Sequence, residues 1–345
     1  MKIITIMIFV LCISMIIAKM QRKNKKMNLK RSKIHLNWKI IRSYAHLSSM
    51  AYDDKTYIED IDNYTYGWKY IGLVENKKWN SRAFVATNHK HKIIVISFKG
   101  SDSLDNFLTD SKISFKKFDK FHEGYNDEVE IHTGFYDYTN SLIELHLNEL
   151  VFKAMKDLNA IEDDVNFITR FVVTGHSLGG AAATIYAHHL YHYLFQNHYR
   201  RKTKILLYTY GSPRVGNQHF ADTINKEIGI NNIFTIQFNN DPITTIPNKC
   251  FYSHVGTLFR CPDKNSYEIV CNTYPSDVAE CGQWSLISRL YKDGKDHLLE
   301  YGYETIGLSE SQLKNQKLRH YQEKPSWSIW LFDKISEKLG FEDLN

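Results

Sequence analysis

Residues 171–180 read Phe-Val-Val-Thr-Gly-His-Ser-Leu-Gly-Gly, so a short apolar run ends in Gly-x-Ser-x-Gly. A run of small residues follows at 181–184 and opens a predicted helix. A strand, a serine flanked by glycines and a helix together predict a nucleophile elbow, a tight turn that projects the serine. The turn places the Ser177 oxygen at a helix N-terminus, where N–H groups favour developing negative charge. Ser177 is therefore the candidate nucleophile.

Predicted strands and helices alternate on both sides of this turn. Periodicity predicts strands at 93–98, 167–174, 204–210 and 233–238, and helices at 38–52, 137–158, 178–195 and 217–228. Short strands at about 250–271 are expected to pair antiparallel at one edge. This alternation predicts an α/β fold with a mostly parallel central sheet and right-handed crossovers.

A serine hydroxyl needs a base that accepts its proton and a carboxylate that orients the base. In this kind of fold the chain order is serine, then acid, then histidine. Asp241 directly follows the predicted strand 233–238, and His297 comes later in the chain. Because ligands of parallel sheets bind at the carboxyl ends of the strands, these placements predict Asp241 as the acid and His297 as the base.

Other readings of these residues stay open. Asp241 precedes a proline, as a purely turn-forming Asp often does, and His297 is one of sixteen histidines. His254 is the rival base, although it lies only thirteen residues after Asp241 and within a predicted strand. His176 adjoins the nucleophile and cannot turn back to its neighbour's hydroxyl.

The tetrahedral intermediate also needs N–H donors for its oxyanion. One is expected from the backbone of Leu178, directly after the nucleophile, and another from the loop after an early strand. The loop 99–102 reads Lys-Gly-Ser-Asp and follows the predicted strand 93–98. Ser101 is therefore the second candidate donor, with an ordinary turn serine as the alternative.

The N-terminal region carries the features of an export signal. Residues 1–18 hold Lys2 and then sixteen uncharged residues, a pattern that predicts a secretory signal peptide and a secreted protein. Ala18 suits a cleavage site, whereas Ile16 is larger than the usual residue there, so an uncleaved signal-anchor remains the alternative. Residues 19–33 hold eight Lys or Arg and no acid and contribute much of the net charge of +6. This segment indicates a solvated basic arm, not a nucleic-acid site.

The five cysteines are consistent with export. Cys12 would leave with the signal, and four cysteines remain within 32 residues, which allows three pairings. We expect Cys250–Cys261 and Cys271–Cys281, with free buried thiols as the alternative. Their spacing is not Cys-x-x-Cys, so zinc binding is not expected of them.

In these blocks the chain resembles the class 3, or fungal-type, triacylglycerol lipase family of α/β hydrolases, over roughly residues 44–303. The resemblance rests on several blocks in a fixed order: 44–52, 98–106, 132–135, 174–180, 209–217, 240–247, 252–256 and 296–301. It implies Ser177 as nucleophile, Asp241 as acid and His297 as base, with His254 structural. It implies Ser101 and Leu178 as oxyanion donors, no metal or organic cofactor, and an ester substrate at a lipid–water interface.

The segment 103–109 is the candidate lid. Leu104, Phe107 and Leu108 have i, i+3, i+4 spacing, so a short helix would carry them on one face. The chain departs from the family in three places: Lys99 stands for the usual Arg, Phe107 for a frequent lid Trp, and 258–260 for an acidic and aromatic pair. These departures bear on substrate preference.

The chain divides into a signal peptide (1–18), a basic arm (19–33), one hydrolase domain (34–306) and a tail (307–345). The tail is expected to hold an amphipathic helix at 327–339, docked on the domain or resting on a lipid surface. The expected function is a secreted triacylglycerol lipase with transient contact to a membrane or lipid droplet. A phospholipase or another carboxylesterase is the main alternative. A peptidase and a non-catalytic binding protein are the other classes considered.

Overall fold

The computed structural model describes residues 37–64, 67–101, 115–117, 128–160, 168–197, 199, 203–238, 241–261 and 268–270. The chain separates into two compact units, Met1–Asn37 and Trp38–Asn345, and nearly all described residues belong to the second. The predicted signal peptide, basic arm and C-terminal tail lie outside the described residues. Among the helices that the structure describes, none combines the length and the apolar character needed to cross a membrane.

An eight-stranded sheet forms the centre of the second unit, in the order β1-β2-β3-β6-β7-β8-β9-β10. The four joins from β3 to β9 are parallel, and the joins β1–β2, β2–β3 and β9–β10 are antiparallel. The strands are β1 (Lys69–Asn76), β2 (Ser81–Asn88), β3 (Ile93–Phe98), β6 (Thr169–His176), β7 (Thr203–Tyr210), β8 (Ile233–Phe238), β9 (Thr257–Cys261) and β10 (Glu268–Val270). A separate pair joins β4 (Phe115–Lys117) and β5 (Glu130–His132).

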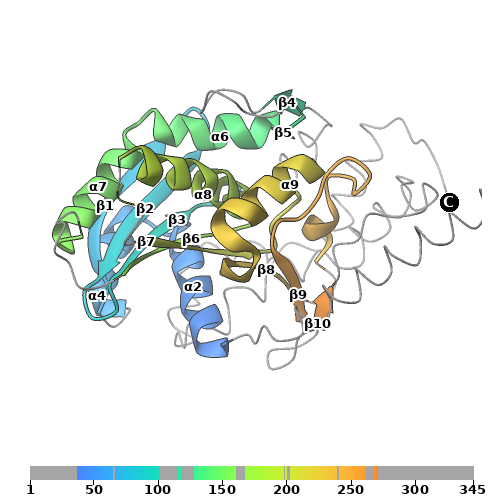
Figure 1. Cartoon of the computed structure of the whole chain (residues 1–345). Coiled ribbons are helices and arrows are strands. Elements are labelled where there is room, and N and C mark those ends of the chain that lie inside the picture. Colours follow the sequence, from blue (N-terminus) through green and yellow to red (C-terminus); the bar gives the residue numbers. More distant parts are fainter. Residues whose placement is uncertain are drawn as a thin grey trace, which may run out of the picture. The chain divides into compact units, whose positions relative to one another are not determined.

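Helices cover both faces of the large sheet, as the ribbon shows (Figure 1). They are α2 (Trp38–Met50), α3 (Lys55–Glu59), α4 (Ile61–Tyr64), α6 (Thr133–Ile143), α7 (Leu147–Asp157), α8 (Leu178–Gln196) and α9 (Gln218–Ile224), with the short turns η2 (Asn225–Gly229), η3 (Ile230–Asn232) and η4 (Pro242–Thr245). Helices α6, α7 and α8 lie over one face, and α2 lies on the other (Figure 1). The fold is thus a three-layer α/β arrangement.

Helix α8 is the central helix of its layer and packs on β3, β6 and β7. Near its N-terminus it has a run of small residues, 179–183, all of which are buried. Small side chains let the helix approach the sheet closely, which the elbow before α8 requires. Alternate residues of β6, Phe171 and Val173, point into this layer and join the main apolar core.

Helix α2 is tied to the opposite face by hydrogen bonds to three parallel strands. The Tyr210 hydroxyl donates to the Ile41 carbonyl at 2.6 Å, and the Ser97 hydroxyl donates to the Leu47 carbonyl at 2.8 Å. Between them, the hydroxyls of Ser48 and Thr174 lie 2.8 Å apart. These bonds satisfy buried polar groups and fix the position of α2 across β3, β6 and β7.

The predicted parallel strands and the helix after the elbow are confirmed within one to two residues. The single helix predicted at 137–158 is wrong, because α6 and α7 are separate helices. His146 stands between them in the left-handed conformation, with φ 71°, and its backbone N–H donates to the Ile143 carbonyl at 3.1 Å. The short strands expected at about 250–271 are confirmed as β9 and β10, which pair antiparallel at one edge of the sheet, while β9 joins β8 in parallel.

Candidate active site

Ser177 occupies the tight turn between β6 and α8 with φ 57° and ψ −128°, a conformation that L-residues rarely adopt. Its N–H donates to the Tyr210 carbonyl at 2.9 Å, and its carbonyl accepts from Gly180 N–H at 2.9 Å. The backbone is therefore held by the neighbouring strand on one side and by the first turn of α8 on the other. Such over-determination is what keeps a strained residue in place.

Two glycines of the motif are required by close backbone approach. A Cβ on Gly175 would collide with the carbonyl of Gly179, and a Cβ on Gly179 would collide with the carbonyl of Phe98. Strand β6, helix α8 and the end of β3 thus meet with no space for a side chain. The Gly-x-Ser-x-Gly pattern has a steric cause here.

The loop after β3 packs directly against the elbow. Phe98 pairs with Gly175 in the parallel register of β3 and β6, so the next residues lie beside the serine turn. A Cβ on Gly100 would lie 2.6 Å from the His176 carbonyl oxygen and would overlap the Tyr52 hydroxyl. Tyr52 in turn donates to that carbonyl at 3.3 Å and lies 3.0 Å from Nδ1 of His176. Three distant segments are therefore locked together beside Ser177.

The candidate oxyanion donors lie on the two sides of this contact. Ser101 is half-buried and comes directly after Gly100. The Leu178 N–H belongs to the first turn of α8, where backbone N–H groups have no acceptor within the helix. The loop that carries Ser101 and the first turn of α8 therefore both adjoin the Ser177 turn.

Lys99 is buried at the base of the same loop. Its Nζ donates to Oδ1 of Asn80 at 3.2 Å, and its carbonyl accepts the Tyr138 hydroxyl at 2.6 Å. Its N–H donates to the Arg82 carbonyl at 3.0 Å. These hydrogen bonds anchor the loop that carries Ser101. They indicate a structural role for Lys99.

Asp241 lies fully buried just beyond the carboxyl end of β8. Its Oδ1 accepts the Ile243 N–H at 2.8 Å and caps the turn η4, and its carbonyl accepts the Thr244 hydroxyl at 2.9 Å. β8 is separated from β6 by β7 alone, so Asp241 and Ser177 emerge at the same edge of the sheet. A buried carboxylate at this edge is suited to orient a base.

Arg214 holds the segment that follows Asp241, a contact that the sequence did not reveal. One of its terminal guanidinium nitrogens, Nη1, donates to the carbonyls of Thr245 and Pro247, the latter at 2.8 Å. Its backbone N–H donates to the Ile246 carbonyl at 2.8 Å. Burial lowers the pKa of Arg214 to about 10, so it stays charged at neutral pH. Arg214 is therefore a positioning residue for residues 241–247, which we call the acid loop because the segment begins with the predicted acid, Asp241.

The geometry of His254 favours a structural role. Its Nε2 donates to the Thr244 carbonyl at 2.7 Å, which leaves that nitrogen without a lone pair for a serine proton. Burial, helped by nearby Arg214, lowers its pKa to about 3 against the opposing effect of the Thr244 carbonyl. A neutral, carbonyl-bound histidine braces the turn after Asp241.

The structure does not describe all of the remaining predicted site residues. His297 and the lid residues Leu104, Phe107 and Leu108 lie outside the described residues, as do Cys271 and Cys281. The predicted Cys250–Cys261 bridge is wrong: Cys250 is disulfide-bonded, whereas Cys261 is a buried thiol in β9.

A serine on a strained elbow at the carboxyl edge of a mostly parallel sheet, with helices on both faces, defines an α/β hydrolase. The chain matches the model of the family lipase (class 3) over residues 95–251. It is 34% identical over 189 residues to the secreted mono- and diacylglycerol lipase 1 of Fusarium solani, covering 54% of this chain and 49% of that protein. It is 27% identical over 228 residues to a lipase of Rhizomucor miehei, covering 66% of this chain and 57% of that one.

Among solved structures, lipase II from Rhizopus niveus has the same fold. The TM-score is 0.61 at 19% identity, over 76% of this chain and 94% of that chain. The chain spans about half the length of the curated relatives that it matches.

Proposed function

We propose that this protein is a serine esterase that hydrolyses the carboxyl esters of acylglycerols. The observation that carries the proposal is the strained Ser177 turn with the Gly100–Ser101 loop packed against it. That arrangement offers a nucleophile and adjacent N–H donors in one place, which are the two elements that acyl transfer needs.

In the proposed reaction the Ser177 oxygen attacks the ester carbonyl while His297 accepts the hydroxyl proton. Asp241 orients His297 and stabilises its charged form, and the N–H groups of Ser101 and Leu178 hold the oxyanion. Collapse of the intermediate releases the alcohol, which takes its proton from His297, and leaves an acyl ester on Ser177. Water, deprotonated by His297, then releases the fatty acid and restores the enzyme.

The acylglycerol substrate is inferred from the family and from the two curated relatives, one of which is named a mono- and diacylglycerol lipase. Such substrates gather at a lipid–water interface. We include the segment 103–109 in the proposal as a lid whose residues Leu104, Phe107 and Leu108 cover the serine in water and contact lipid when it opens. Exposing large apolar side chains costs roughly 1.5–3 kcal/mol each in water and little at lipid.

Secretion is the proposed location. The Fusarium solani relative is named a secreted protein, and the disulfide at Cys250 is of a kind that persists in oxidising compartments. The signal peptide at 1–18 and its anchor alternative remain sequence predictions.

A serine-reactive fluorophosphonate tests the reaction class. We expect it to label the wild-type protein at Ser177 and to leave Ser177→Ala unlabelled, with Asp241→Asn and His297→Ala each lowering kcat by about 10³–10⁴-fold. His254→Gln is the matched control, and it should be less stable but active. A folded, inactive His254→Gln together with an active His297→Ala would reverse the assignment of the base.

The substrate class is tested separately with emulsified triacylglycerol and diacylglycerol against phospholipid vesicles. We expect hydrolysis of the emulsions to exceed that of the vesicles, and the rate on a short-chain ester to rise when the ester passes from solution to emulsion. Faster hydrolysis of phospholipid would replace the acylglycerol assignment, and simple saturation across the phase boundary would remove the lid.

A further inference from the structure

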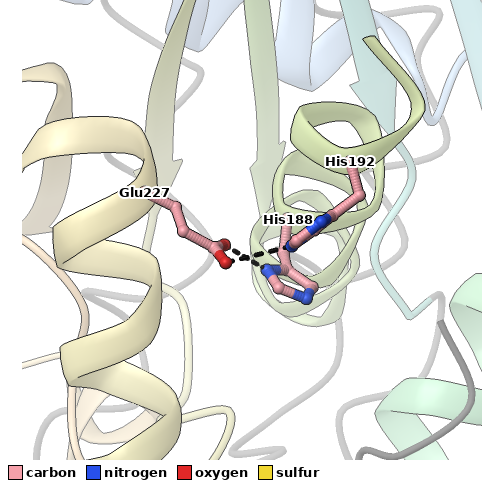
Figure 2. A group of neighbouring side chains, drawn as sticks. All are labelled: His188, His192 and Glu227. Carbon is pink, nitrogen blue, oxygen red and sulfur yellow. Dashed lines mark hydrogen bonds and ion pairs between the residues drawn. The ribbon is translucent and has the colours of Figure 1, made fainter. Parts of the chain in front are cut away.

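Two histidines in the second half of α8, away from the elbow, lie close to a glutamate. His188 and His192 are four residues apart on α8, so they share one face of the helix. Glu227 reaches them from the short helix η2, which follows α9 in the chain. Figure 2 shows the carboxylate directed at both rings. The function proposed above gives these three residues no role.

The distances are those of a compact ligand set. Nδ1 of His188 lies 2.6 Å from one Glu227 oxygen, and Nε2 of His192 lies 3.0 Å from the other. All candidate ligand atoms lie within 4.8 Å of one another. Tetrahedral Zn²⁺, with bonds of about 2.1 Å, needs ligand atoms about 3.4 Å apart, so small side-chain shifts suffice.

The three side chains differ in their exposure to solvent. The His188 side chain is fully buried, whereas those of His192 and Glu227 are 17% and 16% exposed. A buried ligand gives rigidity, and two partly exposed ones give an ion a path of entry and leave room for water as a fourth ligand.

The donor atoms also suit a cation. Glu227 offers carboxylate oxygens, and His188 and His192 each offer one ring nitrogen. Imidazole nitrogen and carboxylate oxygen are both common zinc ligands.

We propose that His188, His192 and Glu227 bind Zn²⁺ as a structural site that joins α8 to η2. The two imidazoles favour zinc over calcium or magnesium, which prefer oxygen ligands. His188 is eleven residues past Ser177. That is about 16 Å along the helix axis, so the ion takes no part in ester hydrolysis. Its effect is to hold the helix that carries the nucleophile.

The test uses the full chain after treatment with a chelator and its removal. Calorimetric titration with Zn²⁺ should show one site, and Co²⁺ should give the visible absorption of tetrahedral coordination. At a hundredfold excess of Zn²⁺ over its dissociation constant, the melting temperature should rise by about 4–5 °C. Mg²⁺ at the same concentration should leave it unchanged.

His192→Gln and Glu227→Gln are the test variants, because both side chains are partly exposed and glutamine keeps hydrogen-bonding groups. Each should weaken Zn²⁺ binding by at least ~100-fold, more than the loss usually seen for residues that only orient ligands. His219→Gln is the control, since His219 is an exposed histidine of α9, next to η2 in the chain. Equal Zn²⁺ affinity in all three variants, or no rise in melting temperature for the wild type, would show a hydrogen-bonded His–Glu–His cluster only.

Discussion

Ser177 holds a conformation that costs an L-residue free energy, and glycine is free of most of that cost. Ser177→Ala and Ser177→Gly both remove the nucleophile but differ in strain. We expect the glycine variant to be more stable than the alanine variant by about 1 kcal/mol, the relief of strain minus the extra entropy of glycine. Urea unfolding of the two variants measures the difference.

The matched pair for this comparison is Ser141→Ala and Ser141→Gly in α6, a buried helical position. There alanine should be the more stable by about 1 kcal/mol, because no left-handed backbone is needed. If alanine were more stable than glycine at position 177 as well, the elbow would store no strain.

Asp53 gives the fold a pH dependence of its own. Burial raises the pKa of this carboxyl to about 7, Asp54 adds to the rise, and Arg82 opposes it. The unfolded chain releases the same proton near pH 4, so folding retains it and stability falls as pH rises from about 4 to about 7. Asp53→Asn should remove this loss, and its stability relative to wild type should increase over that range.

Chemical unfolding at several pH values measures this slope. Asp62→Asn is the control, since Asp62 is an exposed carboxyl in α4. Parallel stability curves for wild type and Asp53→Asn would mean that Asp53 ionises normally in the folded protein.

The turn after β8 depends on one side chain from the segment after β7. Arg214 donates to two carbonyls of the acid loop at once, which a lysine ammonium on a flexible chain does poorly. Arg214→Lys should lower the free energy of unfolding by about 1–3 kcal/mol and lower kcat, because Asp241 loses its fixed position. Arg170→Lys, at an exposed position of β6, should change neither. Wild-type stability and kcat in Arg214→Lys would mean that the loop holds itself.

The parallel strands predicted at 93–98, 167–174, 204–210 and 233–238 were predictable because each contains a run rich in apolar, β-forming residues, and β3 is buried along its whole length. β2 was not predicted because its sequence, Ser-Arg-Ala-Phe-Val-Ala-Thr-Asn, is polar at both ends. It is buried because β1 and β3 lie on its two sides. The break at His146 was missed because neither Gly nor Pro marks it. Tertiary packing decided both elements.

The candidate site likewise contains residues that could be predicted from the sequence and contacts that could not. Ser177 and Asp241 were predictable because each follows a strand at the edge where the carboxyl ends lie. The Tyr52–His176 contact joins residues 124 apart, and Arg214 acts through backbone carbonyls that no pattern reveals. A histidine pair at i, i+4 on the helix 178–195 was visible, but its glutamate partner was not.

The two described cysteines differ in oxidation state. Cys261 is a thiol in β9 that is 2% exposed, whereas Cys250 is disulfide-bonded. Alkylation of the denatured, unreduced protein, followed by peptide mapping, should modify Cys261 and find Cys250 in a cross-linked peptide. An alkylated Cys250, or a Cys250–Cys261 peptide, would overturn this pairing.

From β3 onward the strands of the sheet are laid down in the order in which a ribosome delivers them. The serine turn is complete once Tyr210 has emerged, since its carbonyl takes the Ser177 N–H. Asp241 emerges 31 residues later. A nascent chain that ends shortly after Tyr210 therefore holds every described partner of the Ser177 turn but lacks Asp241, so the site proposed above cannot be complete until the later strands have been made.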